Sequence, residues 1–138
     1  MTLVELLMVI VIVSILMAIA VPSYRGYILR AQRVEATRAL VQAQAAQEKF
    51  FVQNNAYATT LNAAPPAGLG INPLSETGLY DIAMTLTVGG TGFRVTATPR
   101  PGGAQSTDYR CATLTLDSNG LKTALDVASA DTTRECWR

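Results

Sequence analysis

Three side chains in this sequence are placed where they could carry specific chemistry: the thiols of Cys111 and Cys136, and the carboxylate of Glu5 within an apolar stretch. The chain contains no histidine, which excludes imidazole-based zinc sites, Ser–His and Cys–His catalysis, and histidine pH sensing. The sequence also shows no phosphate-binding loop and no cluster of metal ligands. It therefore predicts a protein without catalytic residues, metal or cofactor.

The two cysteines are too far apart for a CxxC metal-binding motif, and no further thiol or imidazole is present to complete a metal site. A disulfide between Cys111 and Cys136 is the simpler interpretation. In the chain-entropy model, closing such a loop stabilises a fold by ~3–4 kcal/mol, which matters for a small domain. A disulfide also indicates an oxidising compartment, either the periplasm or the cell exterior.

Residues 3–21 form an apolar segment in which Glu5 is the only charged residue and Ser14 the only other polar one. At ~1.5 Å per helical residue the segment is about 28 Å long, enough to cross the hydrocarbon core of a bilayer. An ionised carboxylate in hydrocarbon costs several kcal/mol unless it is paired or reaches water, so Glu5 needs a partner. Alternatively, Glu5 lies at the headgroup level near the helix start, where the helix dipole favours an acid.

The charges after this segment conflict with the disulfide over topology. The positive-inside rule applied to the sequence would keep the C-terminal domain in the cytoplasm, because four arginines follow the apolar run: Arg25, Arg30, Arg33 and Arg38. The disulfide indicates the opposite side of the membrane. The conflict disappears if a basic leader preceded Met1 and was removed, so we expect a processed chain.

Pro22 follows the apolar segment and should bend or locally open the helix, because it removes a backbone donor and crowds the carbonyl four residues earlier. Gly26 is a second weak point. Helical periodicity then continues to about Gln53, with an end expected near Asn54 and Asn55. One face of this second half is apolar and should pack on a sheet: Ala36, Ala39, Leu40, Ala43, Ala46 and Phe50.

Residues 56–79 are rich in proline and glycine and predict a long surface loop. Alternation of apolar and polar residues then predicts four strands joined by turns, at residues 80–88, 93–97, 109–116 and 121–124. The predicted fold class is α+β, a long helix with a protruding apolar half and an amphipathic half packed on a four-stranded antiparallel sheet. The tail after the sheet is irregular by pattern, and Trp137 should pack against the disulfide and the sheet edge.

The N-terminal residues MTLVELL, followed by the apolar run and by AVPSY at residues 20–24, resemble the N-terminus of a mature type IV pilin. The segment CATLTLDSNG at residues 111–120 and the closing Cys136 and Trp137 resemble one bacterial pilin subgroup, which includes pilus subunits and a related DNA-uptake pilin. The first residue departs from the family, since mature pilins most often begin with an N-methylated Phe and this chain begins with Met1.

The resemblance implies the pilin fold, closed by a disulfide-bounded C-terminal loop, and a function without catalysis. A prepilin peptidase would cleave before residue 1 and N-methylate Met1. The pilus assembly machinery would then move subunits from the inner membrane, with the head in the periplasm, into a retractable helical homopolymer outside the cell. Glu5 would meet the terminal amine of a neighbouring subunit, and the two charges would neutralise each other only at the correct axial stagger. Pro22 would let the preceding segment loosen in the fibre.

The resemblance also gives a domain division. Residues 1–24 form the transmembrane or filament-core helix, and residues 25–138 form the globular pilin head. Within the head we expect four parts: an amphipathic helix at 25–53, a connecting loop at 54–79, the sheet at 80–124 and the disulfide-bounded C-terminal region at 125–138.

Two alternatives remain for the role of such a subunit. It is either a structural subunit of a pilus used in adhesion, twitching motility or DNA uptake, with other minor pilins as partners, or a low-copy minor pilin that acts as a DNA-uptake receptor. After Val21, eleven Lys and Arg face nine Asp and Glu, giving a net charge of about +2, far below that of a dedicated nucleic-acid binder. Five basic residues could contact DNA phosphates, although six nearby acids make solvated surface charge the better default: Arg94, Arg100, Arg110, Lys122 and Arg134.

Overall fold

The computed structural model describes residues 2–137. The chain forms two compact units, residues 1–31 and residues 32–138. Helix α1 (Leu3–Asn54) contributes its first part to one unit and its second part to the other.

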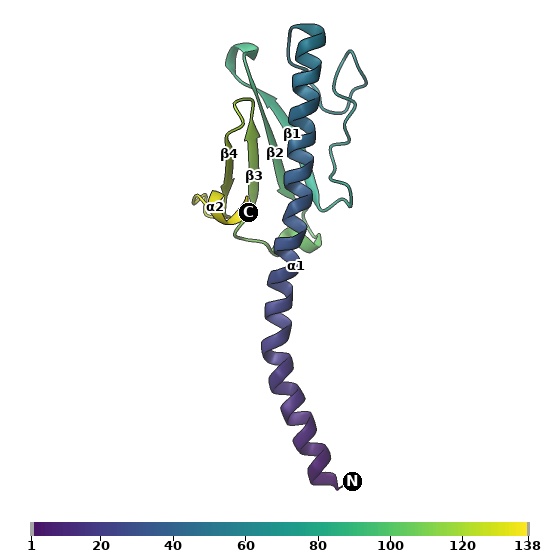
Figure 1. Cartoon of the computed structure of the whole chain (residues 1–138), viewed down its shortest axis with the longest axis vertical. Helices are drawn as coiled ribbons and strands as arrows, with labels where there is room; N and C mark the ends of the chain where they lie inside the picture. Colours follow the sequence, from purple (N-terminus) through teal and green to yellow (C-terminus); the bar gives the residue numbers. More distant parts are fainter. Residues whose placement is uncertain (1, 138) are drawn as a thin grey trace. The chain divides into compact units, whose positions relative to one another are not determined.

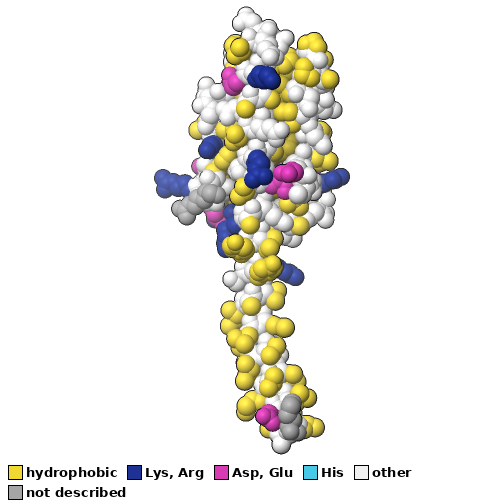
Figure 2. Space-filling view, turned by 45° about the vertical axis from the view of Figure 1, so that its right-hand side comes forward, with side chains coloured by type: hydrophobic (Ala, Val, Ile, Leu, Met, Phe, Trp, Pro, Cys, Tyr) yellow, Lys and Arg dark blue, Asp and Glu magenta, His cyan; other side chains and the backbone are white. Residues whose placement is uncertain are grey.

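In the first unit, α1 is an unbroken helix that continues through Pro22 and Gly26. The local opening expected at Pro22 is therefore wrong for the chain by itself. A proline removes one donor, but its fixed backbone angle is compatible with a helix, and the other residues keep their own bonds to the carbonyl four positions earlier. The large apolar side chains between Leu3 and Val21 are exposed, and many are visible on the face of this unit in Figure 2. The helix is long and apolar enough to cross a membrane.

In the second unit, the remaining part of α1 packs on a four-stranded antiparallel sheet (Figure 1). The strands follow chain order: β1 (Tyr80–Leu86), β2 (Phe93–Pro99), β3 (Thr113–Asp117) and β4 (Lys122–Leu125). Alternate residues of each strand face the helix, as a period of two requires. The fully buried ones are Tyr80, Ile82, Phe93, Val95, Ala97, Leu114, Leu116 and Ala124. The α+β architecture expected from the sequence is confirmed.

The helix face that meets the sheet is only partly the face expected from the sequence. Ala36, Leu40 and Ala43 are fully buried, as predicted. The buried positions before and after them are polar, Arg33 and Gln47, whereas Ala39, Ala46 and Phe50 are half-buried. The apolar stripe predicted the helix correctly. The face that is actually buried is rotated slightly from the stripe, towards Arg33 and Gln47.

The strands β1 and β3 are shorter than predicted, because glycines or turns occupy part of the predicted ranges. β1 ends at Leu86 because Val88–Gly90 form a short 3-10 helix, η1, in which Gly89 and Gly90 have positive φ. β3 begins at Thr113 and not at residue 109, because the preceding residues form turns after a second 3-10 helix, η2 (Ala104–Thr107). The tail is not wholly irregular, since it contains a short helix, α2 (Thr133–Cys136).

The ends of the loop before the sheet are as expected. α1 ends at Asn54, and Asn55 follows in the left-handed conformation with φ 53°. Between it and β1, the described residues form no helix and no strand, apart from an isolated bridge between Leu74 and Asp81. Gln47 fixes the start of this loop, because its amide oxygen accepts from the Ala58 N–H and its amide nitrogen donates to the Ala58 carbonyl, both at 2.9 Å.

The free edge of β4 is covered by the segment that follows it. The Ala124 amide donates to Thr133 Oγ1 at 2.9 Å, and the Ala124 carbonyl accepts from the Thr132 amide at 2.9 Å. The indole nitrogen of Trp137 donates to the Thr123 carbonyl, also at 2.9 Å. The amide and carbonyl of Ala124, which an edge strand would otherwise expose, are therefore occupied.

Candidate functional site

Glu5 and Thr2 cap the start of α1 reciprocally. The Thr2 amide donates to Glu5 Oε2 at 3.4 Å, and the Glu5 amide donates to Thr2 Oγ1 at 3.3 Å. This is the Thr-x-x-Glu capping box, which satisfies two amides that a helix start leaves without partners. The spacing of Thr2 and Glu5 is visible in the sequence, but the sequence-based prediction for Glu5 used only its charge and did not include a capping box. Met1, the expected partner and methylation site, lies outside the described residues.

The side chains of residues 3–21 are exposed to solvent. The large apolar ones range from 41 % exposed at Val13 to 76 % at Leu3. Ser14 does not interrupt this surface, because its hydroxyl donates to the Ile10 carbonyl one turn earlier at 2.5 Å. An apolar surface of this extent must be covered by lipid or by other protein chains.

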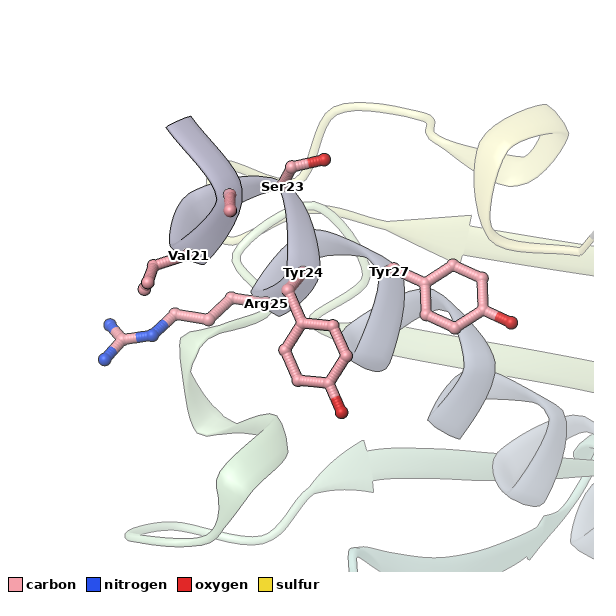
Figure 3. A pocket seen from close by; sticks show the side chains of 6 residues that line it. Val21, Ser23, Tyr24, Arg25 and Tyr27 are labelled. Atoms are coloured by element: carbon pink, nitrogen blue, oxygen red, sulfur yellow. The ribbon is translucent and has the colours of Figure 1, made fainter. Parts of the chain in front are cut away.

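The apolar segment is followed by two tyrosines on the same helix, which line an open surface depression together with Ala20, Val21, Ser23 and Arg25. Tyr24 is 66 % exposed and Tyr27 is 63 % exposed. Figure 3 shows both rings extending from the helix with their hydroxyls at the outer ends, while Arg25 extends in another direction. Amphipathic rings of this kind are enriched where an apolar segment meets water at a membrane surface.

The expected disulfide between Cys111 and Cys136 is present, with Cα atoms 5.8 Å apart. Cys111 lies just before β3 and Cys136 ends α2, so the bond fastens the tail to the sheet; both residues are buried. Trp137 packs at the edge of β4 as expected, and the Lys122 ammonium lies 5.3 Å from the centroid of its ring.

A buried ion pair holds α1 to the segment between β2 and β3. Arg33 Nε and Nη2 donate to the two carboxylate oxygens of Asp108 at 2.7 and 2.8 Å. The hydrogen bond to Asp108 raises the pKa of Arg33. Tyr80 lies in the same region: burial, and then the charge of Asp108, raise the pKa of its phenol well above the ordinary range. From the sequence, Arg33 was considered only for its charge next to the membrane segment, although its position three residues before Ala36 places it on the buried face.

The five basic residues considered for DNA do not share one surface. Arg94 is exposed on the outer side of β2, because its neighbours Phe93 and Val95 point towards α1. Lys122 is on the side of β4 that faces α1, since Leu116 is its register partner. Arg110 is paired with Glu135 at 2.7 Å. Arg100 and Arg134 are exposed.

Comparison with known families decides the class of the protein. The family described as "Type IV minor pilin ComP, DNA uptake sequence receptor" matches residues 22–115. The chain belongs to this type IV pilin family. The pilin also resembles the structure titled "High-Resolution Structure of a Type IV Pilin from Shewanella oneidensis", with 26 % identity and a TM-score of 0.48 over 68 % of this chain and 89 % of that one. No curated protein matches it.

The pilin is therefore a subunit of a type IV pilus, and its family and fold are structural, not enzymatic. Its apolar N-terminal helix fits a membrane-anchored precursor and an extracellular pilus, in which it assembles with other pilins. The family match includes Pro22 and Cys111. It does not extend to Glu5 or to Cys136, so the roles of these two residues rest on the sequence and the geometry.

Proposed function

We propose that this pilin enters the pilus by packing residues 3–21 against the same segment of other subunits, with Glu5 bound to the terminal amine of Met1 in a neighbour. The observation that carries the proposal is an exposed apolar segment, residues 3–21, that holds a single carboxylate in the first turn of α1. Lipid and a fibre core are comparably apolar, so the segment can exchange one for the other at little cost in hydrophobic free energy.

The capping box gives Glu5 a partner that it can exchange. The Thr2 amide is a neutral donor, and its bond to the Glu5 carboxylate is long, at 3.4 Å. An ammonium group brings a full positive charge to the carboxylate and forms a shorter bond with it, of about 2.7–2.9 Å. A neighbouring amine at the correct stagger would therefore replace the Thr2 amide, whereas an incorrect stagger would leave Glu5 with its weak local bond.

Two substitutions separate the capping role of Glu5 from its charge. Glu5→Gln keeps a side chain that suits the capping box but removes the charge, and Thr2→Ala removes the cap but keeps the charge. We expect Glu5→Gln to abolish or greatly reduce incorporation into fibres and Thr2→Ala to reduce it only slightly. Cryo-electron microscopy of native filaments then shows what faces Glu5. Normal incorporation of Glu5→Gln would show that the charge pair is not used.

Before assembly, we propose that prepilin peptidase exposes and methylates the amine of Met1, and that the subunit stays in the inner membrane with its head in the periplasm. Tyr24 and Tyr27 support the position of the apolar segment in a membrane, because they lie just after it with their hydroxyls outward. Mass spectrometry of the mature subunit tests the modification of Met1.

In the fibre, we propose that the helix before Pro22 loosens. An unbroken helix through residues 15–24 in a filament would contradict this.

As a second function we propose that this subunit binds DNA as a low-copy pilin. The observation that favours it is the description of its family as a DNA uptake sequence receptor. The charge of the chain allows this function without requiring it, since the formal net charge is only +1. Binding would then depend on a local group of basic residues and not on the overall charge.

Binding of duplex DNA at a series of salt concentrations tests this second function. Contacts to phosphates release counterions, so the affinity should fall steeply as the salt concentration rises. A chain that shows no salt-sensitive binding is not a DNA receptor. Subunit stoichiometry in purified pili separately decides between a bulk subunit and a low-copy one.

A further inference from the structure

A groove in the second unit lies between α1 and the edge strand β4. Its volume is about 350 Å³, and four residues of α1, the first residue of β4 and one residue of the tail line it: Val34, Thr37, Arg38, Val41, Lys122 and Trp137. Two of the six are cations, none is an acid, and three are apolar or aromatic. It therefore combines an apolar floor with positive charge on opposite walls.

One wall of the groove is formed by side chains of α1. Val34, Arg38 and Val41 follow one another at intervals of four and three residues, so they lie along one face of α1 beside its buried face. Val34 is 50 % exposed and Val41 is 49 % exposed, so neither is used by the core. Their surface is free to contact a bound molecule.

The opposite wall is held by β4 and the tail. Lys122 is on the α1 side of β4, and its ammonium lies over the ring of Trp137. Trp137 is fixed in turn by its hydrogen bond to the Thr123 carbonyl. Both residues lie beyond the part of the chain that matches the family, residues 22–115, so the groove joins the matched helix to the unmatched C-terminal region.

Both cations can bind a further anion. Arg38 meets Glu76 at 3.5 Å, but both side chains are mostly exposed, and ion pairs of this kind contribute little. Among residues 2–137, no carboxylate forms an ion pair with Lys122. A groove with one sign of charge on its walls also raises the local concentration of the opposite sign.

We propose that this groove binds the sugar–phosphate backbone of DNA, an inference that rests on the second proposed function. The backbone alternates anionic phosphates with deoxyribose rings that present apolar C–H groups, which matches cations on two walls with Val34 and Val41 between them. Arg38 and Lys122 contact phosphates, and the ring of Trp137 packs on a sugar. Such contacts hold DNA without reading its sequence.

The test uses the full chain in detergent micelles and a fluorescent DNA duplex, with the dissociation constant measured by anisotropy at several salt concentrations. Each lost phosphate contact lowers the slope of log affinity against log salt by about 0.9. We expect this change for Arg38→Gln and for Lys122→Gln, and about twice the change for the double variant. Arg94→Gln is the matched control, because it removes the same charge from the outer side of β2 and should leave the slope unchanged.

The outcomes separate this inference from the proposed function. Wild-type binding with unchanged slopes for Arg38→Gln and Lys122→Gln would overturn the groove while leaving DNA binding in place. Absence of any binding by the wild type would overturn both. If the two variants reduced incorporation into fibres but not DNA binding, the groove would be a contact between copies of the pilin, and the proposal would again be wrong.

Discussion

Arg33 and Asp108 are separated by 75 residues and meet in a two-bond ion pair inside the head. Asp108→Ala would leave the guanidinium buried without its partner, and breaking a buried pair in this way costs about 3–5 kcal/mol. We expect urea denaturation of the chain in micelles to show a loss of that size.

Two controls make this result specific. Glu135→Gln breaks the exposed pair with Arg110 and should change stability far less. Replacing both partners by apolar residues, Arg33→Met with Asp108→Leu, should recover most of the loss, because neither charge then remains buried. A stability of Asp108→Ala equal to wild type would mean that the pair does not hold α1 in place.

Gln47 stabilises the start of the loop after α1 through two hydrogen bonds to the backbone of Ala58. Gln47→Leu keeps a similar volume but leaves the Ala58 amide and carbonyl without partners at a site that is 2 % exposed. Because each of these two buried unsatisfied groups costs about 1–3 kcal/mol, the expected loss in the free energy of unfolding is about 2–6 kcal/mol. Gln42→Leu, at an exposed position of the same helix, is the control and should be nearly neutral.

Glu35 should make the stability of the head depend on acid pH. Burial raises its pKa, but hydrogen bonds from Ser75 and Thr77 outweigh that effect, so the pKa lies below its ordinary value of 4.5. A depressed pKa contributes stability above the unfolded value that is lost as the pH falls through the folded value. Thermal melts from pH 7 to pH 3 should therefore show Glu35→Gln less stable than wild type at neutral pH, with the difference shrinking below about pH 4.5. A difference that stayed constant over this range would exclude the carboxylate as its cause.

The Cys111–Cys136 bond closes the C-terminal region onto the sheet. Replacing both cysteines by serine should lower the free energy of unfolding by about 2–5 kcal/mol. The same loss should appear when the wild type is reduced, whereas the double variant should be insensitive to reductant. Equal denaturation curves for the oxidised and reduced wild type would show that the bond adds no stability.

The elements of this fold were predictable because its periodicities are strong. The alternation in residues 80–86 and 93–97 predicts β1 and β2, and the stripe of Ala36, Leu40 and Ala43 predicts the buried helix face. Strand ends were less predictable, because Gly89 and Gly90 favour a turn that shortens β1 while Val88 continues the apolar pattern.

The polar contacts of the core were not predictable in the same way. Arg33 and Gln47 carry side chains that usually face water, and their burial depends on Asp108 and Ala58, which are distant in sequence or lie in a loop. The capping box of Thr2 and Glu5 is local and could have been found from its spacing alone. The groove beside Arg38 needs the register of β4 against β3, which sequence patterns do not give.

The cover over β4 has a consequence for polymerisation. With the amide and carbonyl of Ala124 bonded to the tail, a strand from a second head is kept from adding to β4 at this point. The bonds from Ile82 to Pro73 and from Ser75 to Tyr80 protect the beginning of β1 in the same way. Heads brought to high local concentration would thus resist amyloid-like fusion along these protected edges. Subunits of the polymer then associate through side-chain contacts and not through shared strands, so single subunits can dissociate again.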